Sequence, residues 1–143
     1  MNSQFLDFKV IIKQDKEEIL ATCQGQNNKG VFLFYHQEDK HQLPFLRKIL
    51  QAVQLDYDKD IFSLSGNTSL TFSISDILTD RATSKVIVFG FPPTQIGLHL
   101  NLPKYQAHKV GPCTYLFADA LSAIEQQSNL KKLLWEGLQV LFK

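Results

Sequence analysis

The sequence predicts one three-layer α/β domain with a mainly parallel sheet of four or five strands. Short, uninterrupted apolar runs are typical of strands covered on both faces. Segments with helical periodicity separate these runs, and alternating strands and helices favour parallel strands joined by right-handed crossovers. The length of 143 residues fits a single domain over residues 1–143, with an apolar N-terminal arm over residues 1–13 and an α/β body over residues 30–143.

The first half of the body predicts two strands, each followed by a helix. Val31–Tyr35, with the sequence VFLFY, is the first buried strand. Residues 41–55 have apolar side chains on one arc and predict an amphipathic helix, with Pro44 in its first turn, where a missing amide hydrogen is tolerated. Residues 60–64 predict a second strand, and residues 73–79 a short helix.

The second half continues with strands and ends in a long helix. Residues 85–89, KVIVF, repeat the buried-strand pattern, and a loop rich in glycine and proline follows over residues 90–103. Residues 105–110 predict an edge strand and residues 113–117 another buried strand. A final helix is predicted from Ser128 or Asn129 to Phe142.

The N-terminal arm is dense in apolar residues and is expected to pack on another surface. Phe5, Phe8 and Ile12 have helical spacing, whereas Phe8, Val10 and Ile12 also fit the alternation of a strand. Periodicity therefore leaves both structures open, and we favour a helix. Residues 14–30 are polar and end in turn-forming residues.

Composition and charge exclude several classes of protein. Hydrophobic residues make up 44% of the chain and charged residues 20%, which excludes disordered and low-complexity proteins. The net charge of +1 provides no long-range field to attract nucleic acid or an anionic membrane. Cys23 and Cys113 lack metal-ligand spacing, no secretory signal is recognised, and no apolar run reaches the length of a membrane span. We therefore expect reduced thiols, a cytoplasmic location and no membrane partner.

A polar cluster follows the first strand. His36, Glu38, Asp39 and His41 lie where open parallel sheets bind ligands, so a metal or acid/base site is one interpretation. These neighbours lack the paired ligand spacing of a zinc helix, and polar residues are common at the start of a helix. We favour a structural loop and predict no metal.

Motifs for cofactors and nucleophiles are missing. Tyr35 and the loop from Gly90 could form an aromatic slot, but the loop glycines match no phosphate-binding motif, so no cofactor is predicted. Ser122 is not in a G-x-S-x-G elbow, and isolated histidines such as His99 and His108 are usually solvated or hydrogen-bonded rather than catalytic. The residues themselves therefore predict no catalytic group.

The final helix has an apolar arc wider than half its circumference. Two interpretations stay open, a well-packed helix beneath the arm and a partner-binding face. A leucine stripe forms the centre of the arc, and two aromatic residues widen it: Leu130, Leu133, Leu134, Leu138 and Leu141, with Trp135 and Phe142.

Three passages resemble the uracil-DNA glycosylase-like fold and, within it, the psi subunit family of bacterial DNA polymerase III. They are residues 30–64, residues 85–93 and residues 114–142. The most specific part is the last, in which Leu121-Ser122 precedes a helix containing the Lys-x-x-Leu-Trp-like segment that ends at Trp135. The resemblance implies a glycosylase-like α/β fold.

The resemblance also indicates which glycosylase features this chain lacks. Active glycosylases of the fold have a Gly-Gln/Glu-x-Pro loop after the first strand, whereas residues 36–42 read HQEDKHQ, and Phe117 occupies the position of the later loop histidine. The implied pocket is therefore vestigial and not catalytic. We expect it to be formed by five residues: Tyr35, Glu38, Phe91, Phe117 and Ser122.

A protein-interaction subunit is the function that the resemblance implies. Its expected partners are clamp-loader or chi-like subunits, and the expected anchors are Phe5 and Phe8 of the arm with Trp135 and Phe142 of the final helix. The alternative is a divergent glycosylase-like enzyme or a nucleic-acid-base-binding protein that uses a pocket between Tyr35, Glu38 and Phe91. A third possibility is a small-molecule-binding module at the carboxyl edge of the sheet.

Overall fold

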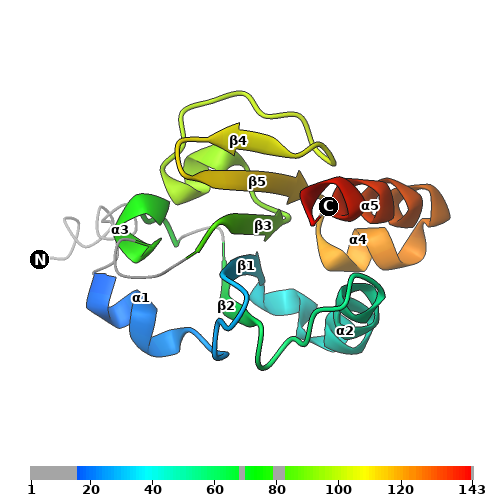
Figure 1. The fold of residues 1–143 in the computed structure, drawn as a ribbon, viewed down its shortest axis with the longest axis horizontal. Helices are drawn as coiled ribbons and strands as arrows, with labels where there is room; N and C mark the ends of the chain where they lie inside the picture. Colours follow the sequence, from blue (N-terminus) through cyan, green and yellow to red (C-terminus); the bar gives the residue numbers. More distant parts are fainter. Residues whose placement is uncertain (1–15, 68–69, 79–82, 143) are drawn as a thin grey trace, which may run out of the picture.

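A five-stranded sheet forms the centre of the computed structural model, which describes residues 16–67, 70–78 and 83–142 (Figure 1). The strand order is β2-β1-β3-β5-β4. Neighbours among β2, β1, β3 and β5 are parallel, and β4 is antiparallel to β5. The prediction of an α/β domain with a mainly parallel sheet is confirmed. The strands are β1 (Val31–His36), β2 (Ile61–Gly66), β3 (Lys85–Phe89), β4 (His108–Val110) and β5 (Cys113–Ala118).

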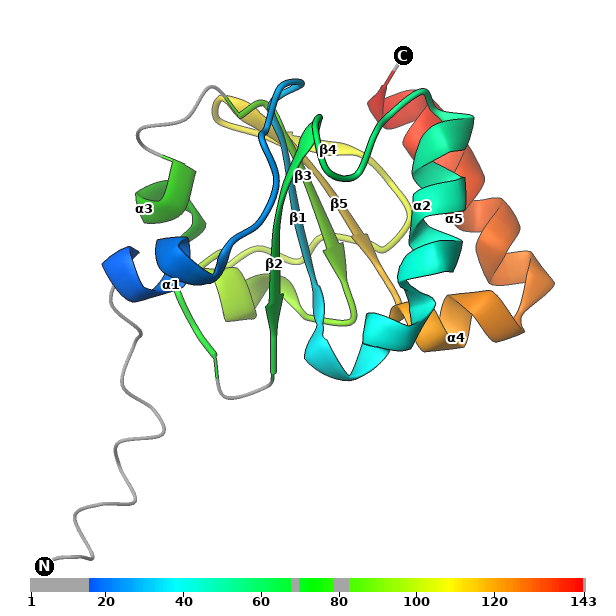
Figure 2. The same cartoon turned by 90° about the horizontal axis from the view of Figure 1, so that it is seen from below.

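Helices cover both faces of this sheet (Figure 2). On one face lie α2 (Leu43–Ala52), α4 (Leu121–Gln126) and α5 (Ser128–Leu141). On the other lie α1 (Lys16–Thr22), α3 (Ile74–Leu78) and the 3-10 helix η3 (Pro93–Ile96). A second 3-10 helix, η2 (Gln37–Gln42), joins β1 to α2. The helices of the described residues are too short or too polar to cross a lipid bilayer.

The sheet separates two apolar cores because successive side chains of a strand point to opposite faces. In β1, Leu33 and Tyr35 lie in the core beneath α2, α4 and α5. Phe32 and Phe34 lie in the core on the opposite side, beneath α1 and α3. Uninterrupted apolar runs supply both layers at once, which is why the buried strands were recognisable in the sequence.

The order of the strands reverses at β1. The crossover through α2 leads to β2 on one side of β1, and the crossover through α3 leads to β3 on the other. Loops after such strands diverge and leave a crevice at the carboxyl edge, where open α/β sheets bind ligands. This topology directs attention to the ends of β1, β3 and β5.

The segment before β1 contains an unpredicted helix and protects the edge of the sheet. Residues 14–30 were expected to be polar and turn-like, but α1 forms there and buries Ile19 to 3% exposure. Of the side chains that the structure describes in α1, Ile19 and Leu20 pack on the core, which is too few to give a periodic signal, so the helix depends on tertiary packing. The chain then pairs with β2, since the Gln24 and Ser63 amides each donate to the other's carbonyl at 2.9 and 2.7 Å. Free hydrogen-bonding groups on the edge strand are thereby covered.

Smaller differences from the prediction have local causes. The edge strand begins at His108 rather than Tyr105, and Tyr105 has a φ of +64°, which extended backbone does not adopt. Part of the loop over residues 90–103 is the 3-10 helix η3. The predicted arm, with Phe5 and Phe8, lies outside the described residues.

Candidate functional site

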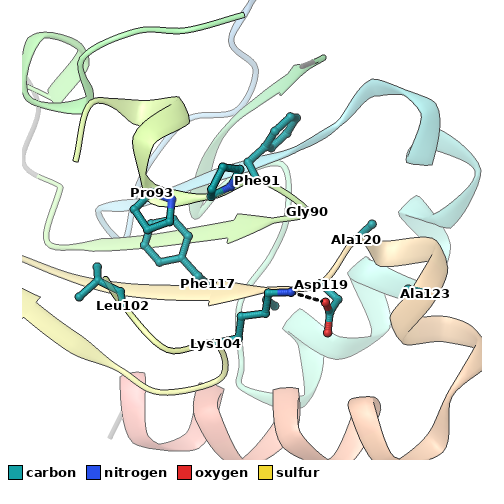
Figure 3. Close-up of a pocket in the computed structure, with 11 residues that line it drawn as sticks. Gly90, Phe91, Pro93, Leu102, Lys104, Phe117, Asp119, Ala120 and Ala123 are labelled. Carbon is teal, nitrogen blue, oxygen red and sulfur yellow. Dashed lines mark hydrogen bonds and ion pairs between the residues drawn. The ribbon is translucent and has the colours of Figure 1, made fainter. Parts of the chain in front are cut away.

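A cleft lies at the carboxyl edge of the sheet, beyond the ends of β3 and β5 (Figure 3). Its volume is about 480 Å³, within the range of small-molecule sites. Phe91, Pro93, Leu102 and Phe117 supply apolar walls, and Lys104 and Asp119 supply the charged groups. The cleft is therefore mostly apolar with one polar end.

Asp119 organises this polar end. It directly follows β5, and one carboxylate oxygen accepts from Lys104 Nζ at 2.6 Å while the other accepts from the Tyr105 hydroxyl at 2.6 Å. The Asp119 amide in turn donates to the Tyr105 hydroxyl at 3.2 Å. Burial would raise the pKa of Asp119, but the hydrogen bonds from Lys104 and Tyr105 outweigh it and lower this pKa below its ordinary value. The carboxylate is thus ionised and already hydrogen-bonded at neutral pH.

An aromatic stack fills the space between the ends of β1 and β3. Phe91 lies parallel to Phe34, with ring centroids 4.4 Å apart, and also stacks on His36 at 5.3 Å. Phe34 and Phe91 are both buried. Because these rings occupy the point where the strand order reverses, the open volume lies beside it, between the ends of β3 and β5.

The five expected pocket residues do not meet in one place. Phe91 and Phe117 line the cleft, and Phe117 lies in the same core as Phe34. Tyr35 belongs to the core on the other face, because it follows Phe34 in the same strand. Glu38 is exposed on η2, and Ser122 is half-buried on α4 without lining the cleft.

Tyr35 belongs instead to a small buried hydroxyl cluster. The Tyr57 hydroxyl donates to that of Tyr35 at 3.4 Å and lies 3.0 Å from the Ser63 hydroxyl. Burial, followed by the hydrogen bond to Tyr57, raises the pKa of Tyr35 above its ordinary value. The side chain is therefore neutral and acts as part of the core beneath α2.

The polar residues after β1 form the η2 turn. His36 Nδ1 accepts from the Glu38 amide at 3.3 Å, which caps the turn. Asp39 is only 6% exposed, and one of its carboxylate oxygens has no hydrogen-bond partner among the described residues. Within residues 16–67, 70–78 and 83–142, no three histidine, cysteine or acidic side chains are grouped to hold a metal ion. Cys23 and Cys113 are free thiols.

No protein-family model matches this chain, and no curated protein is significantly similar to it in sequence. The geometry of its own residues therefore has to define the candidate sites. Besides the cleft, one surface-exposed helix stands out by its exposed apolar groups.

That helix is α5. Four large apolar side chains are exposed among the described residues, and three of them, Leu133, Trp135 and Val140, belong to this helix. Trp135 is 38% exposed, and Phe142, directly after α5, is half-buried at the margin of the core. Within the predicted leucine stripe, Leu134, Leu138 and Leu141 are buried, whereas Leu133 is 41% exposed.

The sequence reasoning missed Lys104, Tyr105 and Asp119. Asp119 carried a usable signal, since it is the first polar residue after a buried strand, at the edge where ligands bind. Lys104 and Tyr105 carried none, because they precede the edge strand and lie 15 and 14 residues away from Asp119. The antiparallel pairing of β4 with β5 and the hydrogen bond from the Tyr105 amide to the Phe117 carbonyl at 2.7 Å bring them together.

Proposed function

We propose that this chain is a non-catalytic protein-interaction subunit resembling the psi subunit of the bacterial DNA polymerase III clamp-loader complex. The observation that carries the proposal is the concentration of exposed large apolar side chains on α5. Helical spacing places Leu133 and Val140 on one flank of α5 and Trp135 on the other. Exposed apolar groups are typical of protein-binding sites, and tryptophan is the residue most often found to dominate binding energy. Clamp-loader or chi-like subunits are the partners that the resemblance proposes.

The state of the charged groups in the cleft supports a role without catalysis. Asp119 and Lys104 are paired with each other at 2.6 Å, and the second oxygen of Asp119 is occupied by Tyr105. A general base needs an oxygen that can accept a proton from the reacting group near neutral pH. The lowered pKa of Asp119 makes it a poor proton acceptor there.

Phe5 and Phe8 of the arm are proposed, from the sequence alone, as a second contact with the partner protein.

Affinity recovery from the native cell tests this function. We expect Trp135→Ala to reduce recovery of the partner at least tenfold, because loss of a buried aromatic anchor costs about 2 kcal/mol or more of binding energy. Leu100→Ala is the matched control, since Leu100 is 48% exposed but lies outside α5. Circular dichroism must show that both variants are folded. Full recovery with a folded Trp135→Ala protein would contradict the proposal.

A divergent glycosylase-like enzyme or base-binding protein is the second candidate. The apolar cleft favours it, because Phe91 and Phe117 offer aromatic walls and the volume of about 480 Å³ can hold a planar base. The purified protein would be incubated with single- and double-stranded DNA containing uracil, and abasic sites and bound DNA would be measured. On this candidate we expect abasic sites or binding that Asp119→Asn reduces at least tenfold. If the wild-type protein shows neither activity nor binding, this candidate is wrong.

A further inference from the structure

Two helices on one side of the sheet carry apolar side chains on the flanks that face each other, and we call these flanks the α2–α5 face. Both helices pack on the same core and lie on the same side of the sheet in Figure 2. Lys131 of α5 lies over the ring of Phe45 of α2, with its ammonium nitrogen 5.7 Å from the ring centroid, so these two flanks face each other. The face comprises Phe45, Ile49 and Ala52 of α2 with Trp135 and Phe142 of the α5 region.

The charges of these two helices are mostly positive. Together α2 and α5 contain four basic side chains and one acidic side chain, a net charge of +3, whereas the whole chain has a net charge of +1. Arg47 is already paired with Asp58 at 2.9 Å, on the opposite flank of α2 from Phe45. The lysines at 48, 131 and 132 form no ion pair with another described residue. Their charges are therefore available to a partner.

Helical spacing places these lysines along the α2–α5 face. Lys48 follows Phe45 by three residues and precedes Ala52 by four, so it lies on the same flank of α2. Lys131 and Lys132 precede Trp135 by four and three residues and share its flank of α5. The acidic residue, Glu136, follows Lys132 by four residues and is exposed. Lys48 and Lys132 thus lie beside the apolar residues of the two helices, and Lys131 lies over Phe45 between them.

We propose that the α2–α5 face binds an acidic amphipathic segment of a partner protein. Apolar side chains of the segment would pack on Phe45, Trp135 and Phe142, and its aspartate and glutamate side chains would lie against the lysines. Amphipathic helices commonly bind apolar grooves in this way, and complementary charges at the rim select the partner and speed association. This inference rests on the proposed function, and it adds the chemistry of the partner.

Two synthetic peptides test the inference with the full chain. The first is an amphipathic helix of about 18 residues with leucines spaced by three and four and glutamates beside them, and the second has glutamine in place of every glutamate. Trp135 is the chain's one tryptophan, so its fluorescence reports directly on this face. We expect the glutamate peptide to shift Trp135 emission and to bind about tenfold more tightly than the glutamine peptide, with the difference disappearing at high salt.

Charge-reversed variants distinguish an effect of the lysines on the α2–α5 face from an effect of the net charge of the protein. In the variant Lys48→Glu/Lys132→Glu, which we call the rim variant, the preference for the glutamate peptide should be lost. The control Lys29→Glu/Lys59→Glu makes the same change of net charge at exposed residues outside both helices and should keep the preference. Equal binding of both peptides by the wild-type protein, or a preference that survives in the rim variant, would overturn the acidic partner and leave apolar docking intact. No emission change with either peptide, while partner recovery still depends on Trp135, would overturn this inference alone.

Discussion

Replacement of Phe34 by alanine is expected to lower the free energy of unfolding by about 3–5 kcal/mol. Phe34 is fully buried in the core beneath α1 and α3. Its ring stacks on Phe91 at 4.4 Å and meets the edge of Phe72 at 5.1 Å. The substitution would remove both contacts and leave a cavity that the rigid sheet cannot close. Urea denaturation followed by circular dichroism measures the loss.

Leu100→Ala is the control for this experiment. Leu100 is 48% exposed, so its truncation should change stability by about 0.5 kcal/mol or less. Comparable losses in the two variants would show that Phe34 is not part of a packed core. The shape of the cleft should also change in the Phe34 variant, because Phe91, which lines the cleft, would lose the ring on which it stacks.

Gly25→Ala should detach the chain that covers the edge of the sheet. Gly25 has a φ of +103°, which residues with a side chain rarely adopt, and an added Cβ would lie 1.9 Å from the Ile61 carbonyl oxygen. Strain and overlap together should cost about 2–4 kcal/mol. Hydrogen exchange would locate the damage, because the Ser63 amide should lose the protection given by its 2.7 Å bond to the Gln24 carbonyl.

Gly111→Ala separates the two parts of that cost. Gly111 also has a positive φ, +63°, but an added Cβ would meet nothing within 4 Å. Only the conformational cost of about 1 kcal/mol should appear, without faster exchange of the Ser63 amide. If Gly25→Ala and Gly111→Ala behave alike, close approach to Ile61 does not matter for stability.

The two candidate sites are independent in position and can be tested separately. The cleft lies at the carboxyl edge between β3 and β5, and Phe91 and Phe117 connect it to the core beneath α1 and α3. The α2–α5 face covers the opposite core. Substitution of Trp135 should leave the cleft unchanged, since Trp135 does not line it and distant side chains usually have additive effects.

Much of the fold could be predicted because burial leaves a local pattern. Val31–His36 and Lys85–Phe89 are strands in the structure, as their uninterrupted apolar runs predicted, and the amphipathic segments at α2 and α5 are helices. The helix α1 could not be predicted in the same way. Among its described side chains, Ile19 and Leu20 pack on the core, and two adjacent residues have no helical period.

The candidate site was predictable only in part. Trp135 was recognised from its place on a wide apolar arc, and its 38% exposure agrees with a surface position. Tyr35 and Phe91 were predicted to share one pocket, but the two side chains lie in different cores on opposite faces of the sheet. The Lys104, Tyr105 and Asp119 cluster went unnoticed because residues from two separate loops, one before β4 and one after β5, create it.

The sequence by itself determined the α/β class, the buried strands and the amphipathic helices, because each of these depends on the spacing of apolar residues within one segment. Only the tertiary structure decided the order of the strands, the face on which each aromatic side chain lies, and the pairing of Asp119 with Lys104 and Tyr105. Those features depend on which segments pair across the sheet, and contacts between distant segments have no signature in local spacing.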